Sequence, residues 1–166
     1  PLCYDANYSI RQTVKAGGCE VSTSAQSLSA DVQLLILSLP KAEIVESVMD
    51  RIHSTLRPNT IVVDTSTSKP TTSQKLSAQA QSGSYFFLDA PVSGGPVAAN
   101  SGTMTMLIGG DSQALDTATP ILEVLTSRIV RVGGSGAGHA AKIANNMLCA
   151  ANLVLVSEAI KLAAAC

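Results

Sequence analysis

A lysine and an asparagine four residues apart, Lys142 and Asn146, stand in an almost uncharged stretch at residues 139–166. On a helix this spacing places both side chains on one face. Apolar surroundings disfavour a charged ammonium, so Lys142 could exchange a proton with a substrate hydroxyl, which Asn146 would hold by a hydrogen bond. Alternatively, Lys142 extends into solvent and the asparagines lie on a solvated face. The scarcity of other charges on this segment favours the first interpretation.

A second candidate site is the segment DAPVSGG at residues 89–95, which follows a predicted strand. Pro91 restrains the backbone, and the hydroxyl of Ser93 then stands beside Gly94 and Gly95. Glycines let a ligand approach the backbone N–H groups closely, so this segment could bind a carboxylate. An ordinary glycine turn is the alternative, and composition alone favours that turn.

An acidic residue, Asp5, follows the first predicted strand. An acid at the end of the second strand of a dinucleotide-binding fold accepts hydrogen bonds from the ribose 2′-OH of NAD, and it would repel the 2′-phosphate of NADP. Taken alone, Asp5 is more simply explained as a helix N-cap. No glycine-rich phosphate loop precedes Asp5, so we expect the sequence to start at the second strand of such a fold.

The glycine cluster at residues 133–138 is similar in position to a phosphate-binding loop, because it follows a predicted strand and precedes a predicted helix. No G-x-G-x-x-G register fits, because His139 stands where the last glycine would be. We therefore predict a flexible domain junction here.

Composition excludes several classes of protein. The 166 residues are 46% hydrophobic and 14% charged, with a net charge of -1, which suits a packed core and excludes disorder. The sequence lacks the stripe of basic residues that is typical of nucleic-acid-binding proteins. The uncharged run at residues 143–157 is too short and too polar for a membrane span. The four cysteines and two histidines have no metal-ligand spacing, so we expect no metal. We expect the cysteines to be reduced thiols, which suggests an intracellular protein, cytoplasmic or mitochondrial.

Short apolar runs and helical patterns alternate along the chain, which predicts an α/β fold with a Rossmann-like, doubly wound, mostly parallel sheet that lacks its first strand. The predicted strands, rich in β-branched or aromatic residues, are 34–37, 60–63, 85–88, 103–108 and 128–132. The predicted helices are 42–52, 70–80, 114–125 and a long one over 139–166. We expect a truncated nucleotide-binding domain at 1–133 and the start of a helical domain at 134–166.

Together these motifs resemble the 3-hydroxyisobutyrate dehydrogenase family of β-hydroxyacid dehydrogenases, in the 6-phosphogluconate dehydrogenase-like superfamily. The DAPVSGG segment, with Ala99 and Gly102-Thr103 behind it, is similar to the substrate-binding signature of that family. The pattern G-x-G-x-x-x-K-x-x-N-N at residues 136–146 is similar to its catalytic signature. The resemblance covers essentially the whole chain.

The resemblance implies a role for each matching residue. On the substrate side, Lys142 would be the catalytic lysine and Asn146 would orient the substrate, while Asn145 lies next to that site. The substrate carboxylate would be bound by Ser93, Gly94 and Gly95. On the cofactor side, the residues implied are Asp5 at the choice between NAD and NADP, Leu39 and Pro40 along the adenosine and ribose, and Thr67 near the nicotinamide.

The function implied is an NAD-dependent oxidation of a small 3-hydroxy acid, with NADP less favoured, by an enzyme that forms a homo-oligomer at full length. We expect these 166 residues by themselves to be inactive. A relative of the tartronate semialdehyde reductase or threonate dehydrogenase type stays open. So do a non-catalytic module that binds a nucleotide or a partner, and a truncated product without function. Intact Lys142 and Asn146 favour an enzyme.

Overall fold

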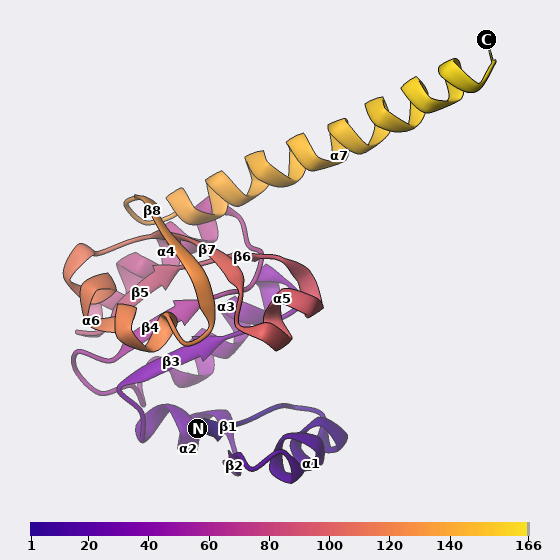
Figure 1. Ribbon diagram of the computed structural model, residues 1–166. Helices are drawn as coiled ribbons and strands as arrows, with labels where there is room; N and C mark the ends of the chain where they lie inside the picture. The colour runs from indigo at the N-terminus through magenta and orange to yellow at the C-terminus, as the bar shows by residue number, and fades with distance from the viewer. Residues whose placement is uncertain (166) are drawn as a thin grey trace.

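The computed structural model describes residues 1–165, which form a sheet domain and one long helix (Figure 1). The first strand, β1 (Leu2–Cys3), pairs in parallel with β2 (Glu20–Val21), and α1 (Tyr8–Ala16) connects the two. In the described part of the chain, these two strands form a sheet of their own, separate from the main sheet. The short helix α2 (Ala25–Ala30) then leads to the main sheet.

The main sheet has six strands in the order β3-β4-β5-β7-β6, with β8 also paired to β7. Three neighbouring strands run parallel and in register, starting from the edge strand β3: β3 (Leu34–Leu37), β4 (Ile61–Asp64) and β5 (Phe86–Asp89). The strand β7 (Met104–Gly109) runs antiparallel to β5 and to β6 (Val92–Ser93), and parallel to β8 (Thr126–Gly133). The α/β fold with a largely parallel sheet is therefore confirmed, although two pairings are antiparallel.

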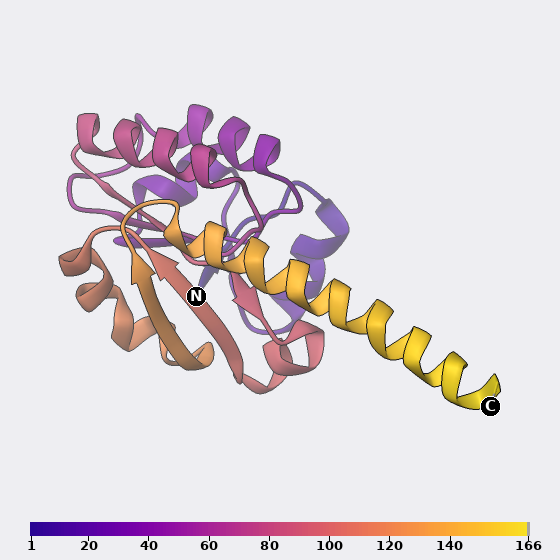
Figure 2. The same cartoon turned by 90° about the horizontal axis from the view of Figure 1, so that it is seen from above.

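Helices cover both faces of this sheet (Figure 2). On one face lie α3 (Ala42–Ile52) and α4 (Pro70–Ser82), and on the other lies α6 (Ser112–Leu122). Successive residues of β4 serve the two cores: Val62 packs in the cluster of α3 and α4, and Val63 packs in the cluster of α6. A strand buried on both faces must be apolar at every position, which explains why β4 is one continuous apolar run up to Asp64.

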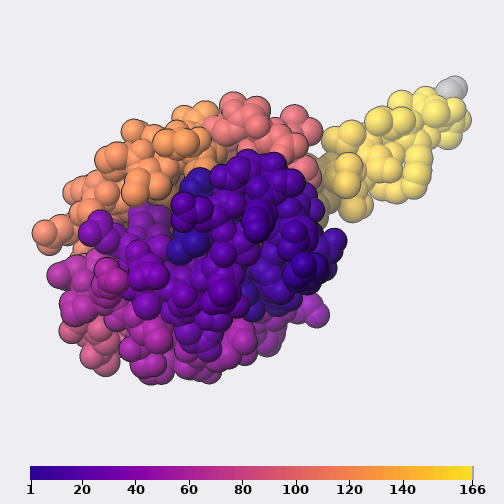
Figure 3. Space-filling model, turned by 90° about the horizontal axis from the view of Figure 1, so that it is seen from below, coloured from indigo at the N-terminus to yellow at the C-terminus, as the bar shows by residue number. Residues whose placement is uncertain are grey.

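The last helix, α7 (Ala137–Ala165), starts on the sheet domain and then projects away from it (Figures 1 and 3). Its outer part is exposed all round, although it is rich in large apolar side chains: Met147, Leu148, Leu153, Val154, Leu155, Val156, Ile160 and Leu162. By length and composition, α7 is the one helix among the described residues that could cross a membrane. Large exposed apolar patches commonly mark surfaces that contact another protein segment or a membrane.

The prediction of a flexible junction at residues 133–138 is wrong. Gly136 and Gly138 are buried, and the first turn of α7 presses against the sheet. A Cβ atom on Gly138 would lie 2.5 Å from the carbonyl oxygen of Asp89 and 2.6 Å from that of Leu107. The glycine at 138 is therefore required by close packing between backbones, and the junction is a fixed one.

Candidate active site

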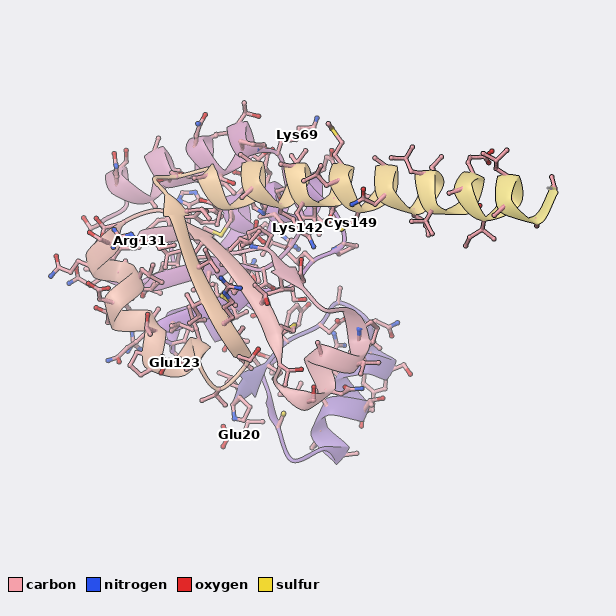
Figure 4. The ribbon with its side chains drawn as sticks, turned by 45° about the horizontal axis from the view of Figure 1, so that its top comes forward. Glu20, Lys69, Glu123, Arg131, Lys142 and Cys149 are labelled. Carbon is pink, nitrogen blue, oxygen red and sulfur yellow. The ribbon has the colours of Figure 1, made fainter. Side chains whose placement is uncertain are left out.

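A cleft of about 600 Å³ lies where the carboxyl ends of β3 and β4 face β6 and the inner part of α7. Ligands of open α/β sheets bind beyond the carboxyl ends of the strands, so the cleft lies where a cofactor and substrate would meet. Figure 4 shows Lys142 pointing from α7 toward the sheet domain. The cleft is lined by Ile36, Ser38, Thr65, Thr67, Val92, Ser93, Gly94, Gly95, Ala99, Met104, Met106, Leu125, Lys142 and Asn146.

Lys142 and Ser93 are in direct contact, although they are 49 residues apart in the chain. The Nζ atom of Lys142 donates a hydrogen bond of 2.7 Å to the Oγ atom of Ser93, and both residues are half-buried. The amine is thus held at the cleft wall beside the predicted carboxylate-binding segment, and Lys142 is not a fully solvated side chain.

The backbone around Ser93 depends on the two glycines that follow it. Gly94 has φ of 128° and Gly95 has φ of 67°, values that residues with a side chain rarely adopt. A Cβ atom on Gly94 would also lie 2.4 Å from the Cβ atom of Ala98. These glycines turn the chain from β6 directly into α5 (Gly95–Ser101), so the predicted glycine-rich segment is an open wall of the cleft.

The position of Lys142 is set by a buried aspartate at the end of β5. The Asp89 carboxylate accepts hydrogen bonds from the backbone N–H of Gly136 at 2.8 Å and of His139 at 3.0 Å. These N–H groups belong to the start of α7, where the helix dipole also favours a negative charge. Asp89 therefore anchors the first turn of the helix that carries Lys142 one turn later.

The loop after β4 forms the opposite wall. Asp64 ends that strand, and its carboxylate accepts a hydrogen bond of 3.0 Å from the backbone N–H of Ser66. Burial raises the pKa of Asp64, and the hydrogen bonds from Ser66 partly oppose that shift. The loop is tied to its neighbour after β3, because Leu39 donates its N–H to the Oγ atom of Ser66 at 2.9 Å. Thr65 and Thr67 are thereby held at the cleft.

Six of the predicted site residues line this one cleft: Thr67, Ser93, Gly94, Gly95, Lys142 and Asn146. Two others, Leu39 and Pro40, lie on the adjacent loop after β3, outside the cleft lining. Asn145 is exposed on α7 and also lies outside the lining.

Asp5 lies apart from the cleft, in the turn between β1 and α1. Its Oδ1 atom accepts the N–H of Asn7 at 2.7 Å, while the N-cap of α1 is Asn7. The explanation of Asp5 as an N-cap is therefore wrong. Arg11 braces this turn, because its Nη1 atom donates to the carbonyl oxygen of Asp5 at 2.6 Å and its guanidinium lies 5.6 Å from the centre of the Tyr4 ring.

No sequence pattern identified the buried residues that hold the loop after β4 and the start of α7 in place, namely Asp64, Ser66, Ser73, Asp89 and His139. Asp89 was part of the recognised DAPVSGG segment, so its place at a strand end was a usable signal. His139 was visible three residues before Lys142, but its partners are too distant in sequence for any local pattern to reveal them.

Polar groups lie on two opposite sides of the cleft. Threonine and serine hydroxyls of the loops after β3 and β4 line one side, and the amine of Lys142 lies on the other. The loops after β3 and β4 would hold a nicotinamide at this cleft, and the cofactor would supply the hydride acceptor there. The fold and the cleft together define a Rossmann-like dinucleotide-binding domain followed by a long helix.

The family follows from comparison with known proteins. The model described as the NAD binding domain of 6-phosphogluconate dehydrogenase matches residues 2–134, and the chain belongs to this family. A probable 3-hydroxyisobutyrate dehydrogenase of Mycobacterium tuberculosis is 37% identical over 89% of this chain and 50% of its own. An NAD-dependent L-serine dehydrogenase of Pseudomonas aeruginosa is 36% identical over 90% of this chain and 51% of its own.

The solved structures agree with this assignment. The structure described as Mycobacterium tuberculosis 3-hydroxyisobutyrate dehydrogenase with L-serine superposes with a TM-score of 0.94 at 35% identity. The match covers 96% of this chain and 55% of that one. The chain thus spans about half the length of the curated relatives it matches. The recognised family and the Rossmann-like fold are confirmed.

Proposed function

We propose that the complete protein oxidises a small 3-hydroxy acid with a nicotinamide dinucleotide, and that this chain supplies the cofactor domain and the proton-transfer group. The observation that carries the proposal is the 2.7 Å hydrogen bond between Lys142 and Ser93 at the cleft wall. The hydrogen bond supports the proposal because it joins an amine to a segment that could bind a carboxylate, and a hydroxy acid requires both groups. The names of the relatives, dehydrogenases of 3-hydroxyisobutyrate and L-serine, support this substrate class.

Each group of the cleft has a distinct task in this mechanism. The Ser93 hydroxyl and the backbone N–H groups beside Gly94 and Gly95 bind the substrate carboxylate. Lys142 then turns from Ser93 to the substrate hydroxyl and accepts its proton as the carbinol becomes a carbonyl. Asn146, one turn further along α7, holds the same oxygen in place. A bound nicotinamide supplies the hydride acceptor.

For the choice of cofactor, we infer NAD rather than NADP. Asp5 lies in the turn after β1, where its negative charge would repel a 2′-phosphate and its oxygens would accept from a 2′-OH. Leu39 and Pro40 would lie along the adenosine side, since their loop is tied to the cleft through Ser66. Thr67 would lie near the nicotinamide.

The exposed outer part of α7 supports a second domain. We propose that residues 134–166 begin an all-helical domain whose other helices cover the apolar side chains of α7, in the complete protein or in its homo-oligomer. That domain would complete the substrate pocket, with Asn145 close to it.

An activity screen of the complete protein tests the proposal. A panel of small 3-hydroxy acids, including 3-hydroxyisobutyrate, L-serine, tartronate-type and threonate-type substrates, is assayed for formation of NADH and NADPH. We expect turnover of at least one of these acids with NAD. Binding of NADH without turnover of any acid would favour a non-catalytic dinucleotide-binding module, and the absence of both would contradict the proposed function.

A further inference from the structure

Two buried aspartates end adjacent strands side by side. Asp64 and Asp89 are paired in register at the ends of β4 and β5, and both are fully buried. The Asp64 carboxylate accepts from the backbone N–H of Ser66 and from the hydroxyl of Ser68, both in the loop after β4. The Asp89 carboxylate accepts from two backbone N–H groups at the start of α7. The cofactor side and the lysine side of the cleft are therefore shaped by two neighbouring but separate anchors.

His139 connects the segments that these two anchors hold. Its imidazole ring is fully buried, and its backbone N–H is one of the donors to Asp89. The Nε2 atom lies 2.9 Å from the carbonyl oxygen of Ser66, and the Nδ1 atom lies 2.6 Å from the Oγ atom of Ser73 on α4. Because a carbonyl oxygen can only accept, Nε2 carries the hydrogen and donates it to Ser66.

Ser66 extends this connection to the far side of the cleft. Its Oγ atom accepts the N–H of Leu39, and its neighbour Thr67 lines the cleft. A continuous path of hydrogen bonds thus runs from the loop after β3, through Ser66 and the His139 ring, to the first turn of α7. Lys142 follows His139 by three residues on that helix, so the path ends about one helical turn before the proposed proton-transfer group.

We propose that His139 is a positioning residue, which sets the separation between Lys142 and the cofactor loops by donating from Nε2 to the Ser66 carbonyl. This inference rests on the proposed function. It assigns to His139 no contact with substrate or cofactor. Its loss would let the loop at residues 65–68 and the start of α7 shift independently, so that cofactor affinity and turnover would both fall.

Two substitutions of His139, by Gln and by Asn, distinguish a positioning role of its hydrogen bond from a role in filling buried space. The two amide side chains differ by one methylene group. In His139→Gln the amide nitrogen can reach the place of Nε2 and donate to Ser66. In His139→Asn the shorter side chain reaches only the place of Nδ1, beside Ser73. Both variants leave a polar side chain in the same buried space, and His53→Asn, at an exposed histidine, is the matched control.

In the complete protein, calorimetric titration measures the Kd for NADH and for NADPH, and steady-state kinetics separate kcat from the KM for the cofactor. We expect His139→Asn to weaken cofactor binding and to lower kcat by on the order of tenfold each, as for the loss of one buried hydrogen bond. His139→Gln should stay within about threefold of the wild type, and His53→Asn should match it. Equal losses in both His139 variants, or no loss in His139→Asn, would overturn the proposal.

Amide hydrogen exchange decides the same question without turnover. In His139→Asn, exchange should accelerate together at residues 65–68 and 136–140, and His139→Gln should restore protection at both. Unchanged exchange at either segment would contradict the positioning role. A wild-type protein that binds neither NADH nor NADPH would contradict the proposed function instead, and the exchange result would still decide the role of His139.

Discussion

The amine of Lys142 donates a hydrogen bond of 2.7 Å to the hydroxyl of Ser93, which joins the two sequence motifs at one point of the cleft. One motif contributes the end of a short strand, and the other contributes the second turn of a helix. In the proposed mechanism the two motifs act together, so a substitution in either motif should affect turnover in the complete protein.

Substitution of Lys142 tests the proton-transfer role. Lys142→Ala should lower kcat by about 10²–10⁴-fold, the usual range for the loss of a general acid or base. Lys142→Arg should be almost as inactive, because a guanidinium keeps the charge but does not release its proton. Circular dichroism should match the wild type in both variants. An arginine variant with near-full activity would make this residue an electrostatic anchor for the substrate.

Substitution of Ser93 separates substrate binding from proton transfer. Ser93→Ala removes both the partner of Lys142 and a predicted donor to the substrate carboxylate. We expect the KM for the hydroxy acid to rise by on the order of tenfold, with a smaller effect on the KM for the cofactor. Ser93→Thr keeps the hydroxyl and is the matched control. An equal rise in both KM values would argue against a carboxylate site at Ser93.

Substitution of Asp5 tests the choice of cofactor. Asp5→Ser removes the charge that repels a 2′-phosphate and leaves the positive charge of Arg11 beside the turn. The ratio of kcat/KM with NAD to kcat/KM with NADP should therefore fall by roughly 10–100-fold. Steady-state kinetics with both cofactors measure that ratio. A wild type that already favours NADP, or a variant with an unchanged ratio, would show that Asp5 does not select the cofactor.

Close packing at Gly138 gives a prediction for stability. Gly138→Ala would press a Cβ atom against two backbone carbonyls, so it should destabilise the fold by about 1–3 kcal/mol and displace the start of α7. Gly134→Ala is the matched control, because a Cβ atom there meets nothing within 4 Å. Denaturant titration of both variants measures the difference in the free energy of unfolding. Equal stability would contradict the tight junction.

Tyr85 gives a prediction for alkaline pH. Its hydroxyl is buried and has no hydrogen-bond partner among the described residues, and burial raises its pKa to about 12 from 10.0. Because the folded state holds this proton more tightly, its stabilising contribution is present below pH 10 and is lost as the pH rises through about 12. Tyr85→Phe should reduce that loss.

At neutral pH, Tyr85→Phe should also stabilise the protein by about 1 kcal/mol, because it removes an unsatisfied buried hydroxyl. Thermal unfolding at pH 7 and between pH 10 and 12 compares the variant with the wild type. A clearly destabilised variant would show that the hydroxyl is hydrogen-bonded in solution.

The sequence predicted the elements with a strong periodic pattern. The bounds of α3 and β3 agree with the predicted 42–52 and 34–37, because an amphipathic helix and a buried apolar strand leave clear signals. The strands β2 and β6 have two residues each, too few to show any period, and α5 begins with Gly95 and Pro96, which indicate a turn. The helices α1 and α2 were also missed.

The candidate site divides in the same way. Lys142 and Asn146 could be paired from their spacing, because one helix carries both. The link from His139 to Ser66 spans 73 residues, and the link to Ser73 spans 66, so only the folded chain brings these groups together. The residues that we propose to contact a ligand left a pattern in the sequence, whereas the residues that support them in the fold left none.

The close packing of Gly138 against the sheet has a consequence for how this protein can evolve. Because the first turn of α7 is locked to β5 and β7, Lys142 moves with the sheet domain whatever surrounds the outer turns of the helix. In the proposed domain arrangement, mutations in the outer turns of α7 would therefore alter the substrate pocket and leave the distance between Lys142 and the cofactor loops unchanged. The packed junction at Gly138 would thus allow substrate specificity to change in evolution while the arrangement of the proposed catalytic groups is preserved.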